Sequence, residues 1–170
     1  DYDYDIIERY SHGEMTDADS IRIDKSVEYH TVSGRKVYGG GGIVPDIFVP
    51  IDTTLATEFY IQCNRKAEQM RFASSMFDRY RDRLSEIDDF DELKEYLSGL
   101  DLGRRFLEYA AEDGIVPKTG EWEKTEPYLM PQLNALVGRY SKLDDEAFYR
   151  FYIEIDDTIR TAVDNPSSVR

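Results

Sequence analysis

The sequence predicts a mostly α-helical protein with a small β element. After Asp52 the apolar residues recur every three or four positions, which is the spacing of amphipathic helices. Before Asp52 the chain is polar and glycine-rich, with short β-favouring runs. We therefore expect an N-terminal part over residues 1–52, a helical bundle domain over 53–164 and a disordered tail over 165–170.

The β element is expected around four consecutive glycines at positions 39–42. These four glycines together forgo roughly 2–4 kcal/mol relative to alanines, so the run fits a backbone that must turn or pass close to another chain. The β-favouring runs 37–38 and 47–49 flank it, and Pro50 ends the second run because proline cannot donate to a sheet ladder. The pattern predicts a glycine-rich hairpin between these two runs.

The residues before this hairpin predict little regular structure. The alternating Asp and Tyr residues at 1–5 are expected to form a solvated turn that leads into a short helix around residues 6–10. Residues 13–30 are polar and predict an exposed excursion, with a short strand over 27–31.

The helical domain should begin with a helix that Thr53 or Thr54 caps and that runs through Leu55, Phe59 and Cys63. A continuation of this helix carries an apolar stripe at steps of three and four residues: Met70, Ala73, Phe77, Tyr80 and Leu84. The opposite face is charged and expected to be solvated: Arg71, Asp78, Arg81 and Asp82. Met70, Met76, Phe77 and Tyr80 could alternatively form a groove for a partner, but a core stripe is the favoured interpretation.

Capping residues predict the next two helices. Asp89 followed by Glu92 is a capping arrangement for a helix over 90–97 that Gly99 ends. Asp101 is expected to cap a following helix that stops at Gly114. Its inward side should carry Leu102, Phe106, Leu107 and Ala110.

Prolines divide the last part of the chain. Residues 115–121 read as a loop, and Pro127 and Pro131 cannot both lie inside one straight helix. We therefore expect a short turn over 122–129 and a helix that starts at Pro131. Asp144 should cap a long final helix from 145 to about 163, with one apolar face: Phe148, Phe151, Tyr152, Ile155, Ile159 and Val163.

Composition excludes several classes of protein. The net charge of −14 disfavours nucleic acid and anionic membranes as partners, because no basic stripe could neutralise phosphates. The single Cys63 excludes an internal disulfide and a four-cysteine zinc site. No run of 18 apolar residues exists, so we expect no membrane-spanning segment.

The chemical motifs that the chain suggests all fail on spacing. The glycines are followed by Ile43-Val44-Pro45 rather than by Gly-Lys-Ser/Thr, which excludes a phosphate loop. A calcium loop that starts at Asp1 would need Gly and Glu where Ile6 and His12 stand. His12 and His30 have no paired ligand at metal spacing. We predict no cofactor and no metal.

One stretch of the sequence does resemble a known family. It comprises Thr31, Ser33-Gly34-Arg35, Gly41-Gly42-Ile43-Val44-Pro45-Asp46-Ile47 and Val49. It resembles the closing segment of the protease core in the carboxyl-terminal processing (tail-specific) serine peptidases, the S41 family, and in particular the Bacteroidetes-type branch. That branch carries an acidic insertion before the glycines, which Arg9-Tyr10-Ser11-His12-Gly13-Glu14 and Ala18-Asp19-Ser20-Ile21 resemble. The specific part of the likeness covers residues 9–52.

The resemblance implies a serine nucleophile whose base is a lysine, since a buried lysine can lose its proton more readily through desolvation. In the family both lie upstream of the glycine-rich segment, in Gly-Ser-Ala-Ser-type and Phe/Tyr-Gly-Lys-Gly stretches, and neither stretch occurs here. Ser33 and Lys36 match neither motif. We therefore expect no catalytic residues in this chain, which alone should be inactive.

The resemblance further implies that the chain is the C-terminal part of an endopeptidase of the periplasm or cell envelope. Its partners would be the upstream protease and PDZ domains of the same protein, the polypeptide substrates and a second copy in a homodimer. The helical domain would dimerise the protease, restrict access to its active site or bind an adaptor. The alternative is a stand-alone helical protein-interaction module without catalytic activity, which binds partners through its Tyr- and Phe-rich surface.

Overall fold

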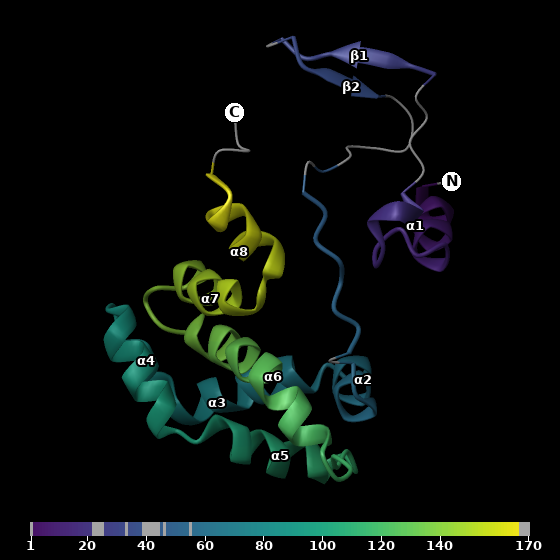
Figure 1. Ribbon diagram of the computed structural model, residues 1–170. Coiled ribbons are helices and arrows are strands. Elements are labelled where there is room, and N and C mark those ends of the chain that lie inside the picture. Colours follow the sequence, from purple (N-terminus) through teal and green to yellow (C-terminus); the bar gives the residue numbers. More distant parts are fainter. Residues whose placement is uncertain are drawn as a thin grey trace. The chain divides into compact units, whose positions relative to one another are not determined.

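A computed structural model of the chain describes residues 2–21, 26–32, 34–38, 45, 47–54 and 56–166. The protein is mostly α-helical with one small antiparallel sheet, which confirms the predicted fold class (Figure 1). The chain divides into two compact units, residues 1–52 with 165–170 and residues 53–164. We call them the N-terminal unit and the helical unit. Residues 167–170 of the expected tail lie outside the described residues.

The N-terminal unit contains two short helical segments and two strands. Helix α1 spans Tyr2–Ser11 and therefore begins earlier than the short helix expected around residues 6–10. A 3₁₀ turn, η1, spans Ala18–Ser20, and the Asp17 side chain caps it by accepting from Asp19 N. The strands are β1 (Glu28–His30), at the place predicted for a strand, and β2 (Lys36–Tyr38).

The hairpin differs from the prediction in its partner strand. Strand β2 pairs with the preceding strand β1, with Tyr29 opposite Val37, and not with residues 47–49. The turn between them is closed by Thr31 N, which donates to Arg35 O at 2.8 Å, and Gly34 adopts the positive φ of +82° that this turn requires. Residues 47–49 form no strand, while the glycine run 39–42 itself lies outside the described residues.

None of the side chains that the structure describes in the N-terminal unit is buried. Large apolar side chains on α1 and the hairpin are instead exposed, including Tyr4 (74%) and Ile7 (66%). Two strands of three residues each do not form a stable sheet in water unless they pack against something else. The described part of this unit therefore has no hydrophobic core of its own.

The helical unit begins with α2 (Glu58–Arg65), α3 (Glu68–Leu84) and α4 (Phe90–Gly99). It continues with α5 (Leu102–Glu112) and α6 (Glu121–Gly138). It ends with α7 (Asp145–Tyr152), the 3₁₀ turn η2 (Ile153–Ile155) and α8 (Asp157–Asp164). No helix in the described residues is long and apolar enough to cross a membrane.

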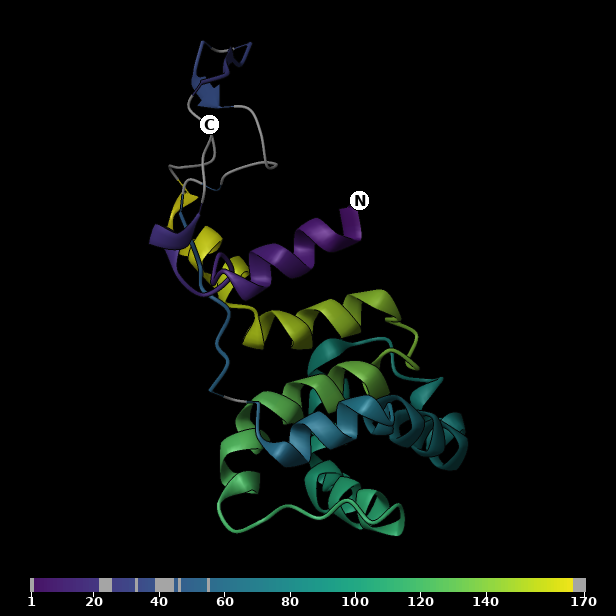
Figure 2. The same ribbon diagram turned by 90° about the vertical axis from the view of Figure 1, so that its right-hand side faces the viewer.

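Helix α6 lies in the middle of the helical unit and packs against α2, α3, α4, α5 and α7. Figures 1 and 2 show α7 on one side of α6 and α3 and α5 on the other. Leu129, Leu133, Ala135 and Val137 of α6 are completely buried. The core formed around them extends from Phe59 in α2 to Phe151 in α7.

Helices α2 and α3 are separate, and this corrects the predicted first helix. Thr57, rather than Thr53 or Thr54, caps α2 by accepting from Tyr60 N at 3.2 Å. The chain then breaks at Ala67, whose φ of +53° is left-handed, so α3 starts afresh. Phe59 and Cys63 are buried as expected. Leu55 lies outside the described residues.

The new start also shifts the buried face of α3. Met70 is 65% exposed, and Gln69, Phe72 and Met76 are buried together with the predicted Ala73 and Leu84. Phe77 and Tyr80 are only partly buried, and the helix departs from helical geometry at Tyr80, with φ −119° and ψ 17°. The charged face was predicted correctly, since its four members are exposed: Arg71, Asp78, Arg81 and Asp82.

Helices α4 and α5 begin directly after Asp89 and Asp101, as the sequence predicted. The Asp89 carboxylate accepts from Glu92 N at 2.9 Å, and α4 ends at Gly99 as predicted. Asp101 occupies the position before α5, but with φ +52° its side chain makes no cap and pairs with Arg104 instead. Leu102, Phe106 and Ala110 are buried and Leu107 partly so.

Helix α6 contains both prolines, which corrects the predicted turn over 122–129. Each proline removes one N–H donor from the helix and crowds the carbonyl four residues earlier. This bends the helix at the proline, and the packing of neighbouring helices keeps both parts in place. Figure 2 shows the first turns of α6 inclined to the rest. Burial of Leu129 and Leu133, beside the prolines, holds the helix together across the bend.

The predicted final helix is interrupted. Asp144 lies before α7 but makes no side-chain cap, and the helix ends at Tyr152. The chain turns at Asp156, whose carboxylate accepts from Ile159 N at 3.0 Å and so starts α8. Phe151 is buried, but Ile159 and Val163 are exposed, so no continuous apolar face runs from 145 to 163.

We expect Asp89→Ala to lower the free energy of unfolding of the chain by about 1 kcal/mol, because it removes the side-chain acceptor at the start of α4. The neighbouring Asp88 is exposed and caps no helix, so Asp88→Ala should change the same quantity by less than about 0.5 kcal/mol. Urea unfolding followed by circular dichroism measures both. Equal losses from the two variants would contradict the assigned cap.

Candidate functional site

Lys36, His30 and His12, which the sequence excluded as catalytic or metal-binding residues, are all exposed. Lys36 Nζ lies 2.6 Å from Glu28 Oε2 and is half-exposed, so it is a paired surface lysine. His30 Nε2 lies 3.5 Å from the other oxygen of Glu28, and His12 Nδ1 lies 2.8 Å from the backbone oxygen of Glu8. Ser33 lies outside the described residues. Across the described ranges, no group of three or more His, Cys, Asp or Glu side chains could hold a metal ion.

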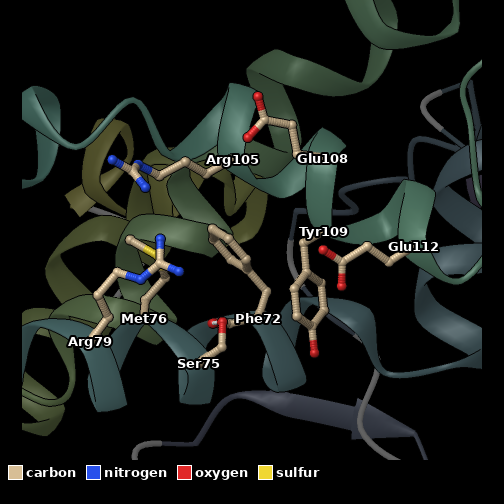
Figure 3. A pocket seen from close by; sticks show the side chains of 8 residues that line it. All are labelled: Phe72, Ser75, Met76, Arg79, Arg105, Glu108, Tyr109 and Glu112. Atoms are coloured by element: carbon tan, nitrogen blue, oxygen red, sulfur yellow. Dashed lines mark hydrogen bonds between the residues drawn. The ribbon is translucent and has the colours of Figure 1, made fainter.

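The most distinctive polar site of the helical unit is a pocket between α3 and α5, which we call the α3/α5 pocket (Figure 3). Its volume is about 160 Å³. Helix α3 contributes Phe72, Ser75, Met76 and Arg79, and α5 contributes Arg105, Glu108, Tyr109 and Glu112. Four of these eight residues are charged, so the pocket is polar.

Aromatic contacts hold the two walls of this pocket in place. The Phe72 ring meets the edge of Phe106 at 5.4 Å and of Tyr109 at 5.6 Å between centroids. Each such edge-to-face pair stabilises the fold by about 0.5–1.5 kcal/mol beyond the contribution of the apolar area that it buries. Phe72 and Phe106 are buried, so the floor of the pocket belongs to the core of the unit.

The charges are separated along the pocket. In Figure 3 the guanidinium groups of Arg79 and Arg105 lie at one side, and Tyr109 and Glu112 lie at the other. Arg79 makes no ion pair with a carboxylate of the described residues, whereas most arginines of the helical unit do. Arg105 Nε donates to Leu100 O at 2.6 Å, and its guanidinium lies 5.8 Å from the centre of the Tyr80 ring. Neither arginine forms an ion pair with a carboxylate of the described residues, although Arg105 is near enough to Asp101 to contribute to lowering the pKa of that carboxyl.

The acidic residues of the pocket differ from each other. Glu108 accepts from Arg104 at 2.7 Å and is therefore already paired. Glu112 is exposed and has no ion-pair partner among the described residues. The pocket thus offers two cationic donors at one end and one free carboxylate at the other.

A cluster of charged residues around the buried Glu68 lies beside this pocket, at the break between α2 and α3. The Glu68 side chain is completely buried; its Oε1 accepts from Arg71 at 3.1 Å, and its Oε2 has no hydrogen-bond partner among the described residues. Arg71 also donates to Asp113 Oδ2 at 2.6 Å, and Lys66 Nζ donates to Asp113 O at 3.0 Å. Arg71 lies 5.9 Å from the centre of the Tyr109 ring, which connects the cluster to the pocket wall.

The two carboxyl groups of this cluster respond to it in opposite ways. Burial, followed by the nearby Asp113, raises the pKa of Glu68. The hydrogen bond from Arg71 lowers the pKa of Asp113. Arg71 thus holds Asp113 in the charged form while Glu68 retains its proton to higher pH.

Cys63 lies in the core near the same cluster and has no second cysteine to pair with. Burial, and secondarily the charge of Glu68, raises the pKa of its thiol to about 12. Because the thiolate is the reactive form, this cysteine is a packing residue rather than a nucleophile.

A second and larger pocket, of about 520 Å³, lies between α4, α5 and α6. Its apolar lining comes from Leu97, Leu102, Leu107, Trp122 and Met130. Gly103 permits the close approach of α5 to α6 there, because a Cβ at this position would lie 3.2 Å from Met130 Sδ and from Trp122 Cζ2. The charged residues at its rim include both signs, so its shape favours no particular charge in a ligand.

Neither pocket was predicted from the sequence. Arg79 and Arg105 are 26 residues apart in the sequence, which gives no local signal, and the phase of α3 was wrong by about one residue. The sequence could not predict that Arg79 makes no ion pair among the described residues, because the packing of α3 against α5 decides which side chains lie near it.

Part of the helical unit is similar to a known protein family. Residues 59–141 match the model of a family that is described as a family of unknown function (DUF8443). No curated protein and no solved structure matches the chain.

We expect Glu68→Gln to stabilise the folded chain at pH 8 and to leave its stability nearly unchanged near pH 4. Because the folded state raises the pKa of Glu68, this carboxyl supports folding most below its unfolded pKa and loses that support as pH rises through its folded pKa. Glutamine mimics the protonated form at every pH.

Thermal unfolding at both pH values measures this difference. The matched control is Glu95→Gln, which removes the same charge on the exposed face of α4. A Glu68→Gln variant that is less stable at pH 8 than at pH 4, relative to wild type, would show that the charged form is the favoured one.

The buried thiol gives a second prediction. In the folded chain at pH 7.5, Cys63 should react with a small disulfide reagent at least a hundredfold more slowly than in urea, because both burial and a pKa of about 12 suppress the thiolate. Absorbance of the released thiol follows the reaction, and the single cysteine makes the assignment unique. Similar rates in both states would contradict the burial of this side chain.

Proposed function

We propose that this chain is the C-terminal part of a serine-type carboxyl-terminal processing endopeptidase of the S41 family. In this proposal the N-terminal unit completes the protease core, and the helical unit is a domain attached to that core. The serine and lysine of the catalytic pair would lie upstream, so the chain alone would have no peptidase activity. The envelope or periplasm would be its compartment.

The observation that carries the proposal is the contrast in burial between the two units. The described part of residues 1–52 buries no side chain and exposes apolar residues on α1 and on the hairpin, although the stretch 9–52 carries the specific family likeness. A segment that belongs to a larger domain would bury these side chains against the rest of that domain. Exposed strands such as β1 and β2 can also pair with a neighbouring sheet edge.

The helical unit supports a role that is separate from the chemistry. Its core is complete within the unit, and the family match over 59–141 lies entirely inside it. The two pockets described above are suited to binding, and neither holds a nucleophile hydrogen-bonded to a base among the described residues. Adaptor or substrate binding is therefore better supported than a purely structural spacer.

The same two features support the second candidate, a stand-alone helical interaction module. A complete core and surface pockets are what such a module needs. The two candidates differ in what they require of the N-terminal unit, which the module would leave exposed and the protease would bury.

An active-serine probe distinguishes the candidates. The 170-residue chain should not be labelled by a fluorophosphonate. The longer polypeptide encoded by the gene together with its upstream sequence should be labelled once per chain, at a serine in a Gly-Ser-Ala-Ser-type stretch. Replacement of the lysine in the upstream Gly-Lys-Gly stretch by alanine should reduce this labelling at least a hundredfold, since the serine loses its base.

Two results would defeat the protease proposal. One is an upstream coding sequence without the serine and lysine stretches, which would leave the interaction module. The other is stoichiometric labelling of the 170-residue chain itself, which would place a nucleophile where the structure provides none.

A further inference from the structure

We propose that the α3/α5 pocket binds an acidic side chain of a polypeptide partner, with its carboxylate between Arg79 and Arg105. The partner would carry a basic residue about three positions away, which pairs with Glu112. This inference goes beyond the proposed function and does not depend on whether the N-terminal unit completes a protease.

The cationic end of the pocket determines the sign of the ligand. Arginine guanidinium groups bind carboxylates with two parallel hydrogen bonds, and such charge-assisted bonds are roughly twice as strong as neutral ones. Arg79 has no carboxylate partner among the described residues, so it can bind one without breaking an existing pair. Unlike Arg65, which also makes no ion pair among the described residues, Arg79 lines a pocket together with Arg105, so an anion there can contact two guanidinium groups.

The overall negative charge does not oppose this binding strongly. Charges in water are screened over about 8 Å at physiological ionic strength, so the two arginines dominate at the site itself. Overall repulsion does select against ligands with a high negative charge, and this is why the partner should carry a basic residue as well.

The size of the pocket favours a side chain over a free small molecule. Pockets for drug-sized ligands are about 300–1,000 Å³. The α3/α5 pocket, at about 160 Å³, has room for little more than one side chain. The buried Phe72 ring and Met76 side chain at its floor, with the aliphatic parts of the arginines, accept the methylene groups of a glutamate.

The spacing along α5 sets the spacing in the partner. Arg105 and Glu112 are seven residues apart on one helix, which is about 10 Å along its axis. An extended peptide covers about 3.3 Å per residue, so a lysine three positions from the glutamate would reach Glu112. Because the direction of the peptide is free, a test peptide should carry a lysine on both sides.

The test uses the 170-residue chain and a fluorescently labelled peptide, Lys-Ala-Ser-Glu-Ala-Ser-Lys, with neutral ends. Fluorescence anisotropy measures its binding at 50 and 150 mM salt. The matched peptide has glutamine in place of the glutamate. The pocket predicts that this change weakens binding at least tenfold, because the glutamine cannot pair with the arginines.

The glutamine peptide separates the pocket from general attraction. It is more positive than the glutamate peptide, so a chain with a charge of −14 should bind it more tightly if only overall charge matters. The two explanations therefore predict opposite orders of affinity.

Variants assign the binding to the pocket. Arg79→Gln should weaken binding of the glutamate peptide about tenfold and leave the unfolding transition unchanged, since Arg79 is exposed and makes no ion pair among the described residues. Glu112→Gln should weaken it about threefold, and only for peptides that carry lysine. The control is Arg65→Gln, an exposed arginine of α2 outside the pocket that also has no carboxylate partner, which should change the affinity less than twofold.

Several results would overturn the inference. They are no binding of the glutamate peptide at millimolar concentration, equal or tighter binding of the glutamine peptide, and equal effects of Arg79→Gln and Arg65→Gln. Displacement of the peptide by millimolar inorganic phosphate would show instead a general anion site. None of these results bears on the active-serine experiment, so failure here and failure of the proposed function remain distinguishable.

Discussion

The packing of α6 in the middle of the helical unit is the constraint on which the other helices depend. Every helix from α2 to α7 contacts it, and its buried side chains form the centre of the core. Gly138 at its end lets α4 and α7 approach closely, because a Cβ there would lie 3.3 Å from both Leu93 and Phe151. The positions of the surface pockets follow from this arrangement, since α3 and α5 lie on one side of α6 and meet through Phe72 and Phe106.

The features that sequence reasoning predicted well are those that depend on a few adjacent residues. The cap at Asp89 needs only the carboxylate and the amide of Glu92, and the loop before α6 needs only Gly114, Pro117 and Gly120. Buried residues of α5 were also predicted, because that helix is short and starts at a recognisable place. Over three turns, a small error in the assumed helical period does not move a residue from the buried face to the exposed face.

The features that were missed depend on contacts between distant residues. No glycine or proline marks the break between α2 and α3. There the left-handed Ala67 lies between buried Cys63 and buried Glu68, and Lys66 is held by Asp113 of the α5 end. The two prolines of α6 are tolerated because the helix is surrounded by packing partners. The strand partner of β2 was wrong because a turn over 31–35 competes with the glycine run, and local propensity does not rank the two.

The side chains that hold α3 against α5 also set the geometry of the proposed binding pocket. The edge-to-face contacts of Phe72 with Phe106 and Tyr109 fix the distance between α3 and α5, and therefore the distance between Arg79 on one helix and Arg105 on the other. Two turns before Arg79 on α3, Arg71 forms ion pairs with Glu68 and Asp113 and lies against the same Tyr109 ring. Arg71 and Arg79 belong to one helix, two turns apart, and among the described residues Arg71 forms ion pairs with two carboxylates whereas Arg79 forms none. The difference arises because the acidic end of α5 lies beside the start of α3, whereas its arginine-bearing first turns lie beside Arg79. The antiparallel course of these two helices thus produces a neutralised end and a cationic end on one surface.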